Sequence, residues 1–133
     1  MLDAKSVCSS FAVGDIEAAR RFYGEVLGLP VQDSVLGMPG ANLPRGLRIG
    51  IGAAAQVFVY SRPNHVPAPF TILNLTVPDI DAAVDELTSR GVQFEHYAGP
   101  PETNAKGIRR DPSVHPTAWF TDPSGNVLSL IEA

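Results

Sequence analysis

The chain has 133 residues, a formal net charge of −4, and 44% hydrophobic and 18% charged residues, which fits one globular domain. The acidic balance and scattered basic residues exclude nucleic acid and anionic membranes as expected partners. The single cysteine, Cys8, excludes an internal disulfide. No stretch approaches the roughly 20 apolar residues of a membrane span. With no signal peptide visible, we expect a cytoplasmic protein.

The first half of the chain predicts a strand, a helix and a hairpin. Asp15 suits the N-cap of the helix, and Gly28 suits its left-handed end. A Gly- and Pro-rich loop over residues 33–46, with room for a short strand, separates the helix from the hairpin. The predicted elements are strands 7–13, 47–51 and 56–60 and a helix over 16–27.

The second half repeats this scheme after a proline-rich linker over residues 63–69. Asp79 and Gly91 bracket its helix, and Asp122-Pro-Ser-Gly-Asn126 predicts a tight turn. A second long loop covers residues 98–116 and, like the first, is expected to shape the mouth of a pocket. The predicted elements are strands 71–77, 92–97, 117–121 and 127–131 and a helix over 80–90.

The two halves share one sequence pattern. Phe11-Ala-Val-Gly-Asp-Ile-Glu-Ala-Ala returns as Leu75-Thr-Val-Pro-Asp-Ile-Asp-Ala-Ala. The repeat predicts an α+β fold with two βαβββ modules, about residues 5–62 and 70–133, in one domain spanning 1–133. In a pseudo-two-fold arrangement, the modules would form a concave mixed sheet with the helices on its convex side.

Three stretches carry a family resemblance that covers nearly the whole chain. They are Val13-Gly-Asp-Ile-Glu-Ala-Ala-Arg-Arg-Phe-Tyr-Gly-Glu-Val-Leu-Gly28, Val77-Pro-Asp-Ile-Asp-Ala-Ala-Val-Asp-Glu-Leu87 and Trp119-Phe-Thr-Asp-Pro-Ser-Gly-Asn-Val-Leu-Ser129. In this order and spacing, the chain resembles the vicinal oxygen chelate superfamily. Its members include glyoxalase I, extradiol dioxygenases, fosfomycin-resistance thiol transferases and bleomycin-binding resistance proteins. The resemblance implies the fold described above and a homodimer.

The resemblance also implies positions for metal ligands, and this chain departs from the pattern there. One ligand is expected seven residues before each helix-capping aspartate, where this chain has Cys8 and Ile72. Another is expected four residues after the hairpin glycine, at Ser129, and the last falls within residues 53–61, which contain no acid and no histidine. Glu132 has the opposite strand parity to Ser129. A catalytic ion needs three or four converging donors, so we expect no metal and no cofactor.

Strand alternation predicts which side chains line the cavity. Phe11, Val13, Leu73, Leu75 and Val77 should pack beneath the helices. Trp119 enters the cavity set because the resembling thiol transferases have a ligand-contacting residue at that place. The expected ligand-binding residues are Cys8, Ser10, Ile72, Asn74, Thr117, Trp119, Thr121 and Ser129.

This lining holds hydroxyls, an amide, a thiol and an aromatic ring but no carboxylate, so it suits a small organic molecule better than acid–base catalysis. The leading hypothesis is a metal-free binding protein of the glyoxalase/bleomycin-resistance type. An enzyme is the alternative: a divergent lyase, isomerase or thiol transferase, or one working through Cys8 or His115. A partner-binding module whose groove is filled by its own side chains, Trp119 included, is a third hypothesis. No catalytic residue is assigned.

Overall fold

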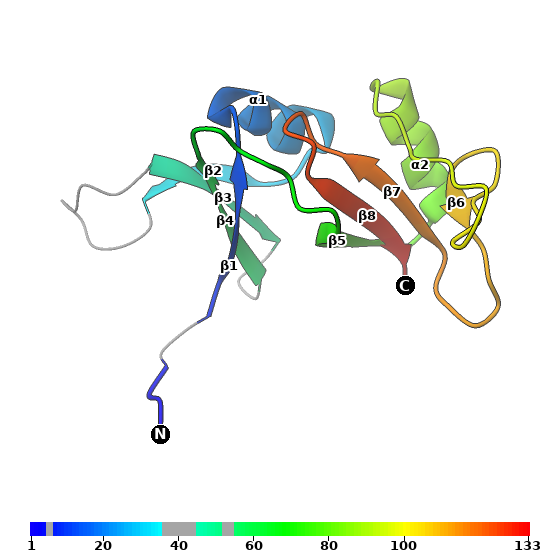
Figure 1. The fold of residues 1–133 in the computed structure, drawn as a ribbon, viewed down its shortest axis with the longest axis horizontal. Helices are drawn as coiled ribbons and strands as arrows, with labels where there is room; N and C mark the ends of the chain where they lie inside the picture. The colour runs from blue at the N-terminus through cyan, green and yellow to red at the C-terminus, as the bar shows by residue number, and fades with distance from the viewer. Residues whose placement is uncertain (5–6, 36–44, 52–54) are drawn as a thin grey trace. The chain divides into compact units, whose positions relative to one another are not determined.

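The computed structural model describes residues 1–4, 7–35, 45–51 and 55–133. The chain divides into two compact units, Met1–Val66 and Pro67–Ala133. Each unit has one four-stranded mixed sheet and one helical segment (Figure 1). The predicted α+β fold with two repeated strand–helix modules is therefore confirmed. In the described part of the chain, no helix combines the length and apolar character that crossing a membrane requires.

The sheet of the first unit has the strand order β1-β4-β3-β2. β1 pairs with β4 in parallel, and the other two pairs are antiparallel. The short strand considered for the loop over residues 33–46 is β2, and the hairpin turn at residues 52–54 lies outside the described residues. The elements are β1 (Ser9–Val13), α1 (Ile16–Arg21), η1 (Phe22–Val26), β2 (Val31–Val35), β3 (Arg45–Ile51) and β4 (Ala55–Ser61).

The predicted helix over residues 16–27 is correct in extent but changes its winding midway. Asp15 accepts hydrogen bonds from the backbone N–H groups of Glu17 and Ala18 at 3.0 and 3.1 Å, which confirms it as the N-cap. After Arg21 the helix continues as the π-helical turn η1, in which the Leu27 N–H donates to the Phe22 carbonyl oxygen at 2.9 Å. Gly28 then takes a φ of 72° and ends the segment, as predicted.

The second unit repeats the topology with the strand order β5-β8-β7-β6. The Asp122 carboxylate accepts hydrogen bonds from the N–H groups of Ser124 and Asn126, both at 2.9 Å, and so forms the predicted hairpin turn. The elements are β5 (Thr71–Val77), α2 (Ile80–Ser89), β6 (Ile108–Arg109), β7 (Thr117–Thr121) and β8 (Val127–Glu132).

Two carboxylates bind the first turn of α2. Asp79 accepts a hydrogen bond from the Ala82 N–H at 3.0 Å, as its predicted N-cap role requires. Glu132 in β8 accepts one from the Ile80 N–H at 2.9 Å. The side chain of Glu132 therefore lies on the face of its sheet that α2 covers, which agrees with the parity assigned from the sequence.

The predicted strand over residues 92–97 is wrong. Phe94 makes only an isolated bridge to Phe120, and Glu95 adds one N–H bond to the Trp119 carbonyl oxygen at 2.8 Å. The remaining edge of β7 is taken by β6, a two-residue strand inside the loop predicted over residues 98–116. Two short segments thus share the edge that one continuous strand was expected to occupy.

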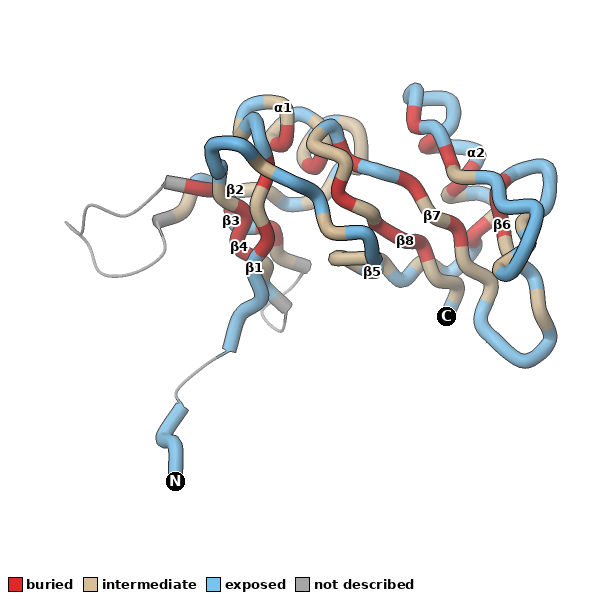
Figure 2. Tube along the Cα trace, viewed as in Figure 1, coloured by how far each residue is buried: buried red, intermediate tan, exposed pale blue. Residues whose placement is uncertain are grey.

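Each unit buries one apolar layer between its sheet and its helix. In the first unit, Phe11, Val13, Leu47 and Val59 are buried, and in the second, Ala118, Phe120, Leu128 and Leu130 are buried beneath α2 (Figure 2). Leu73 and Leu75 pair with Leu128 and Leu130 and so share the helix-facing side, as predicted, although they are only half-buried.

Candidate functional site

One face of the sheet β5-β8-β7-β6 points away from α2 and carries most of the predicted site. The register aligns Asn74, Ser129 and Trp119 in one row across β5, β8 and β7. Their neighbours of opposite parity are the buried apolar side chains under α2. We call this face, defined by Asn74, Ser129 and Trp119, the second open face. Five of the eight predicted residues lie on it: Asn74, Thr117, Trp119, Thr121 and Ser129.

Asn74 and Ser129 form a hydrogen-bonded pair at the centre of this face. The Ser129 hydroxyl donates to Oδ1 of Asn74 at 2.6 Å. Ser129 is only 1% exposed, whereas Asn74 is exposed. The hydroxyl engages one lone pair of the amide oxygen, and the Asn74 NH₂ group is the N–H donor that this pair can offer to a ligand.

Trp119 is partly exposed on β7 and contacts a second aromatic ring that the sequence reasoning missed. The ring centroid of Tyr97 lies 5.8 Å from that of Trp119, with an interplanar angle of 66°. Partial burial, with a smaller contribution from the charge of Glu95, raises the pKa of the Tyr97 phenol above its ordinary value. The neutral phenol therefore persists throughout the physiological range. Tyr97 was missed because no face was assigned to the predicted strand over residues 92–97. Alternation with the buried Val92 and Phe94 was the signal that could have placed it on the open side.

The other predicted residues of this unit have weaker positions. The Thr117 hydroxyl donates to the His115 carbonyl oxygen at 2.9 Å, whereas Thr121 is exposed at the far end of β7. Ile72 lies between Thr71 and Leu73, where the pairing of β5 with β8 shifts register. At this irregularity Ile72 has no direct cross-strand partner in β8, so strand alternation alone does not define its direction.

Cys8 and Ser10 belong to the first unit. Cys8 is an exposed free thiol just before β1, and Ser10 is exposed within β1. Ser10 pairs with Phe58, and Ala12 pairs with Tyr60. The sequence did not settle the parity of β4, and this register fixes it. Phe58 and Tyr60 lie on the side of Ser10, away from the buried layer of Leu47 and Val59. The sequence reasoning did not assign these two aromatic residues to a face.

Two of the metal positions implied by the family resemblance can be located from the strand register. Ser10 and Asn74 occupy equivalent places in the repeat, and their partners in the adjacent strand are Phe58 and Ser129. Phe58 is therefore the residue of the first unit that is equivalent to Ser129 in the second unit. Throughout the described residues, no three His, Cys, Asp or Glu side chains come together in a way that could hold a metal ion.

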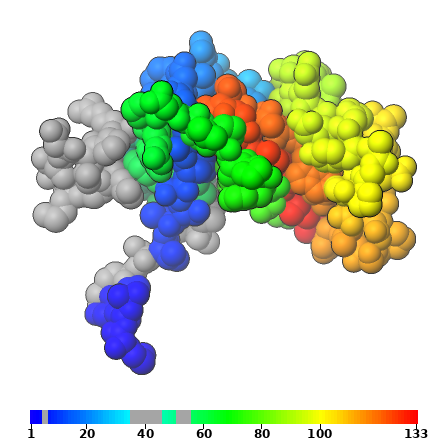
Figure 3. Space-filling model, in the orientation of Figure 1, coloured from blue at the N-terminus to red at the C-terminus, as the bar shows by residue number. Residues whose placement is uncertain are grey.

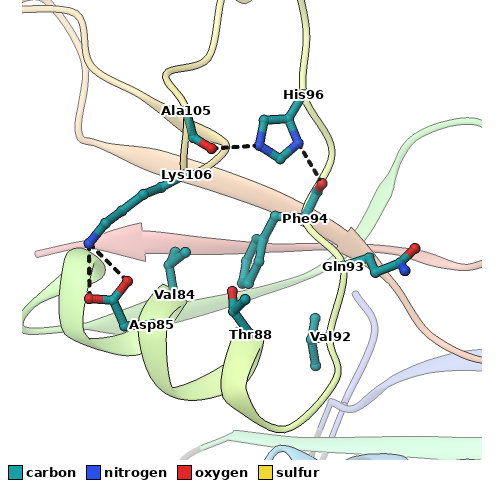
Figure 4. A pocket seen from close by; sticks show the side chains of 9 residues that line it. All are labelled: Val84, Asp85, Thr88, Val92, Gln93, Phe94, His96, Ala105 and Lys106. Carbon is teal, nitrogen blue, oxygen red and sulfur yellow. Dashed lines mark hydrogen bonds and ion pairs between the residues drawn. The ribbon is translucent and has the colours of Figure 1, made fainter.

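A cavity of about 480 Å³ lies at α2, beside the segment of residues 92–96 (Figure 4). Its rim groups bind one another. The ring nitrogens of His96 lie 3.0 Å from the Phe94 carbonyl oxygen and 2.9 Å from that of Ala105. Lys106 forms an ion pair with Asp85 at 2.8 Å. The lining also includes the side chains of Thr88 and Gln93, so the cavity presents polar groups as well as the apolar surface of Val84, Val92 and Phe94.

Part of the loop over residues 98–116 is attached to α2. Lys106 pairs with Asp85, and Arg110 pairs with Asp81. Hydrogen bonding to Asp85 and the nearby carboxylates raise the pKa of Lys106. Most of this loop lies at the surface of the unit, yellow to orange in Figure 3. These contacts hold residues 106–110 against the helix.

Comparison with known proteins agrees with this fold. The family model of the Glyoxalase/Bleomycin resistance protein/Dioxygenase superfamily matches residues 7–130. A member of that superfamily from Sphaerobacter thermophilus DSM 20745 is 29% identical, with 96% of this chain and 98% of that one covered and a TM-score of 0.66. TnmS3, an antibiotic binding protein from Streptomyces sp. CB03234, is 28% identical, with 97% of each chain covered and a TM-score of 0.67.

A more distant solved structure shares the fold alone. The fosfomycin resistance protein FosX from Listeria monocytogenes is 13% identical, with 98% of this chain and 94% of that one covered and a TM-score of 0.67. Among curated proteins, none matches the chain significantly. The family model spans both repeats and every motif on which the resemblance rests. The chain therefore belongs to the Glyoxalase/Bleomycin resistance protein/Dioxygenase superfamily.

Proposed function

We propose that this protein binds a small aromatic molecule on the second open face without the help of a metal ion. The observation that carries the proposal is the pair of partly exposed rings of Trp119 and Tyr97, whose centroids are 5.8 Å apart. Asn74 lies in the same cross-strand row as Trp119, two strands away across β8. Two rings at an angle form a corner that a flat molecule can enter with stacking on one ring and edge contact with the other. The Asn74 NH₂ group supplies a donor for a carbonyl oxygen of the ligand.

The composition of the second open face favours binding over catalysis. Among the described residues, the strand positions on this face carry hydroxyl, amide, aromatic, aliphatic and guanidinium groups, and none carries a carboxylate. The carboxylate of Glu95 lies outside these strands, close enough to Tyr97 for its charge to raise the pKa of that phenol. General acid–base catalysis needs a group that changes protonation at the reacting atoms. The 28% identity to an antibiotic binding protein supports an organic molecule as the ligand.

The metal-free part of the proposal is supported by the side chains at the ligand positions. Cys8, Phe58, Ile72 and Ser129 offer one thiol and one hydroxyl, and the hydroxyl already donates to Asn74. A catalytic divalent ion needs at least three strong protein donors. We therefore expect binding of an aromatic probe to be unchanged after dialysis against a chelator.

A cytoplasmic location and a homodimer also belong to this proposal. The free, exposed thiol of Cys8 suits a reducing compartment. The apolar side chains of Val7 and Phe70 are 96% and 65% exposed, and exposed apolar side chains are candidates for burial in an interface. Light scattering after gel filtration should give twice the mass of 14.1 kDa. A monomer at micromolar concentration would contradict the dimer.

Trp119 is the single tryptophan of the chain, so its fluorescence reports directly on the proposed site. The probe is coumarin-3-carboxamide, a flat neutral molecule that absorbs tryptophan emission. Titration should quench Trp119, and Tyr97→Leu should weaken binding by about fivefold through loss of one aromatic contact. Thr88→Ala, on α2 at the other side of the same sheet, is the matched control and should bind normally.

Two results would contradict the proposed function. The first is an absence of quenching up to the solubility limit of coumarin-3-carboxamide and of related flat neutral molecules. The second is quenching that disappears with chelator and returns with a stoichiometric divalent ion, since that result requires a metal in the binding site.

A further inference from the structure

The first unit carries a second aromatic surface, and beside it lies Arg48, a cation that pairs with no carboxylate among the described residues. The register aligns Ser10, Phe58 and Arg48 in one row across β1, β4 and β3. Arg20 of α1 pairs with Asp33, the cross-strand neighbour of Leu47, so α1 lies on the side of Leu47. Arg48, which has the opposite parity, points away from the helix. We call this side, defined by Ser10, Arg48, Phe58 and Tyr60, the first open face.

The guanidinium group of Arg48 has only neutral partners among the described residues. Its Nη1 lies 3.4 Å from Oε1 of Gln56, and its Nη2 lies 3.5 Å from Oγ of Ser34. Both contacts are at the long end of hydrogen bonding, so they orient the group while leaving it free to bind a stronger acceptor. Five of the other basic side chains in the described part of the chain are paired with carboxylates: Arg20, Arg90, Lys106, Arg109 and Arg110.

The aromatic part of the first open face is held in place by packing. Phe58 is 6% exposed, and its ring fills the space in which a side chain at position 46 would stand, over Gly46. The ring of Tyr60 stacks on that of Phe58, with centroids 6.1 Å apart and an interplanar angle of 17°. Tyr60 is partly exposed, so it presents an apolar surface backed by a fixed ring. Phe58 is also the direct cross-strand partner of Arg48.

The internal repeat shows that this arrangement is not a requirement of the fold. The counterpart of Phe58 in the second unit is Ser129, and the counterpart of Arg48 is Trp119. At the same two places, one unit has an aromatic ring and a cation, and the other has a hydroxyl and an aromatic ring. An arginine at this place therefore adds a chemistry that the second open face lacks at the corresponding position.

We infer that the first open face binds the acidic group of a flat aromatic molecule, a carboxylate or an ionised phenol, with Arg48 as the residue that recognises the charge. The planar guanidinium can donate two parallel hydrogen bonds to a carboxylate. Tyr60 provides the surface against which the aromatic part of the ligand rests. The inference rests on the proposed function only in taking the ligand to be a small aromatic molecule.

The test compares coumarin-3-carboxylate with coumarin-3-carboxamide, which share the same ring system and carry a charged carboxylate or a neutral amide at the same position. Isotope-labelled protein is titrated with each, and binding is followed by NMR at the Arg48 Nε–H and at the backbone amides of β3 and β4. The carboxylate should shift these signals and bind more tightly than the amide. Raising the salt concentration should weaken the carboxylate alone, because the charge of a partly exposed guanidinium is screened.

Variants assign the effect to Arg48. Arg48→Gln should weaken the carboxylate by about tenfold, as expected for loss of a charge-assisted bidentate contact, and should leave the amide unchanged. Arg21→Gln removes the same charge from α1, so it is the matched control and should have no effect. Arg48→Lys should recover only part of the affinity, since an ammonium group lacks the planar fork.

Three outcomes would overturn the inference: no shift of the β3 and β4 signals by the carboxylate, equal loss in Arg48→Gln and Arg21→Gln, or unchanged affinity in Arg48→Gln. The fluorescence of Trp119 separates this inference from the proposed function. Quenching by the amide with no carboxylate binding at Arg48 leaves the proposed function intact and removes the inference. Carboxylate binding at Arg48 without any quenching of Trp119 supports the inference and contradicts the proposed function.

Discussion

The same substitution, glycine to alanine, should have opposite effects at two places in the first unit. At Gly46 a Cβ atom would overlap the carbonyl oxygen of Val59 and come within 2.8 and 3.0 Å of two ring carbons of Phe58. At Gly24 in η1, the nearest atoms would be the Cγ2 and Cβ of Val31, at 3.7 and 3.8 Å, which is ordinary van der Waals contact. The first site has no room for a methyl group, and the second does.

These distances set the expected magnitudes. A methyl group forced against backbone and ring at Gly46 must push β3 away from β4, and overpacking of this kind costs about 1–3 kcal/mol. Because the obstacle is partly a backbone oxygen, which cannot change rotamer, we expect the upper end, about 3 kcal/mol. At Gly24, alanine removes the entropic penalty of glycine in a helical segment and should stabilise by up to about 1 kcal/mol.

The assay is urea unfolding followed by far-ultraviolet circular dichroism, with both variants and the parent protein measured side by side. The midpoint should fall for Gly46→Ala and stay level or rise for Gly24→Ala, a difference of about 3–4 kcal/mol between the two variants. Gly46→Ala should also weaken coumarin-3-carboxylate, because it displaces Phe58 from its place beside Arg48. Equal stability of the two variants would refute the steric argument.

Two further predictions concern charged groups. Glu132→Ala removes the acceptor of the Ile80 N–H and should lower the free energy of unfolding by about 1–2 kcal/mol. Urea unfolding measures this loss, and Glu102→Ala, an exposed carboxylate of the same unit, should have no effect. Hydrogen bonds from the Ser113 N–H and hydroxyl hold the pKa of Asp111 below its ordinary value of 3.8. The contribution of this turn is therefore complete above about pH 4 and is lost as the pH falls through the lowered pKa, so the Ser113 amide shift should move only below that range. A shift of that signal near neutral pH would contradict the assignment.

Local backbone chemistry explains which parts of the fold were readable from the sequence. Asp15 and Asp79 have side chains that accept hydrogen bonds from helix N–H groups, and Asp122 does the same for its turn. Each of these structures is therefore predictable from the residue type at one position. The same holds for Gly28 and Gly91, whose φ values of 72° and 92° favour a residue without a Cβ atom. These features fixed both helices and the second hairpin.

The misassigned strand shows what local signals leave out. Val92 and Phe94 alternate with polar residues as a strand would, and both are buried. Whether such a segment forms a full ladder depends on what else reaches the edge of β7, and Ile108 does so from a loop with no strand pattern. Competition for one sheet edge is a property of the tertiary structure and leaves no periodic trace in the sequence.

The candidate site divides in the same way. The family resemblance placed Trp119 and Ser129 in the cavity and strand alternation placed Asn74 there, and the register brings all three into one row. Phe58 and Tyr60 were missed because the register of β4 depends on its parallel pairing with β1, which is a contact between distant parts of the chain. The role of Arg48 could not be predicted from the sequence, because a single arginine in a strand is indistinguishable from a solvated side chain until its neighbours in space are known.

The repeat also bears on how specificity could change in evolution. In each unit the buried layer on the helix side maintains the sheet, so most side chains of the two open faces are less constrained by packing. Phe58 and Ser129 are buried exceptions, yet they show that equivalent register positions accept different side chains, as do Arg48 and Trp119. A duplicated module of this kind keeps one half unchanged while the other explores new partners. A few substitutions on the open faces can therefore redirect the molecules that such a protein recognises without rebuilding the layer beneath the helices.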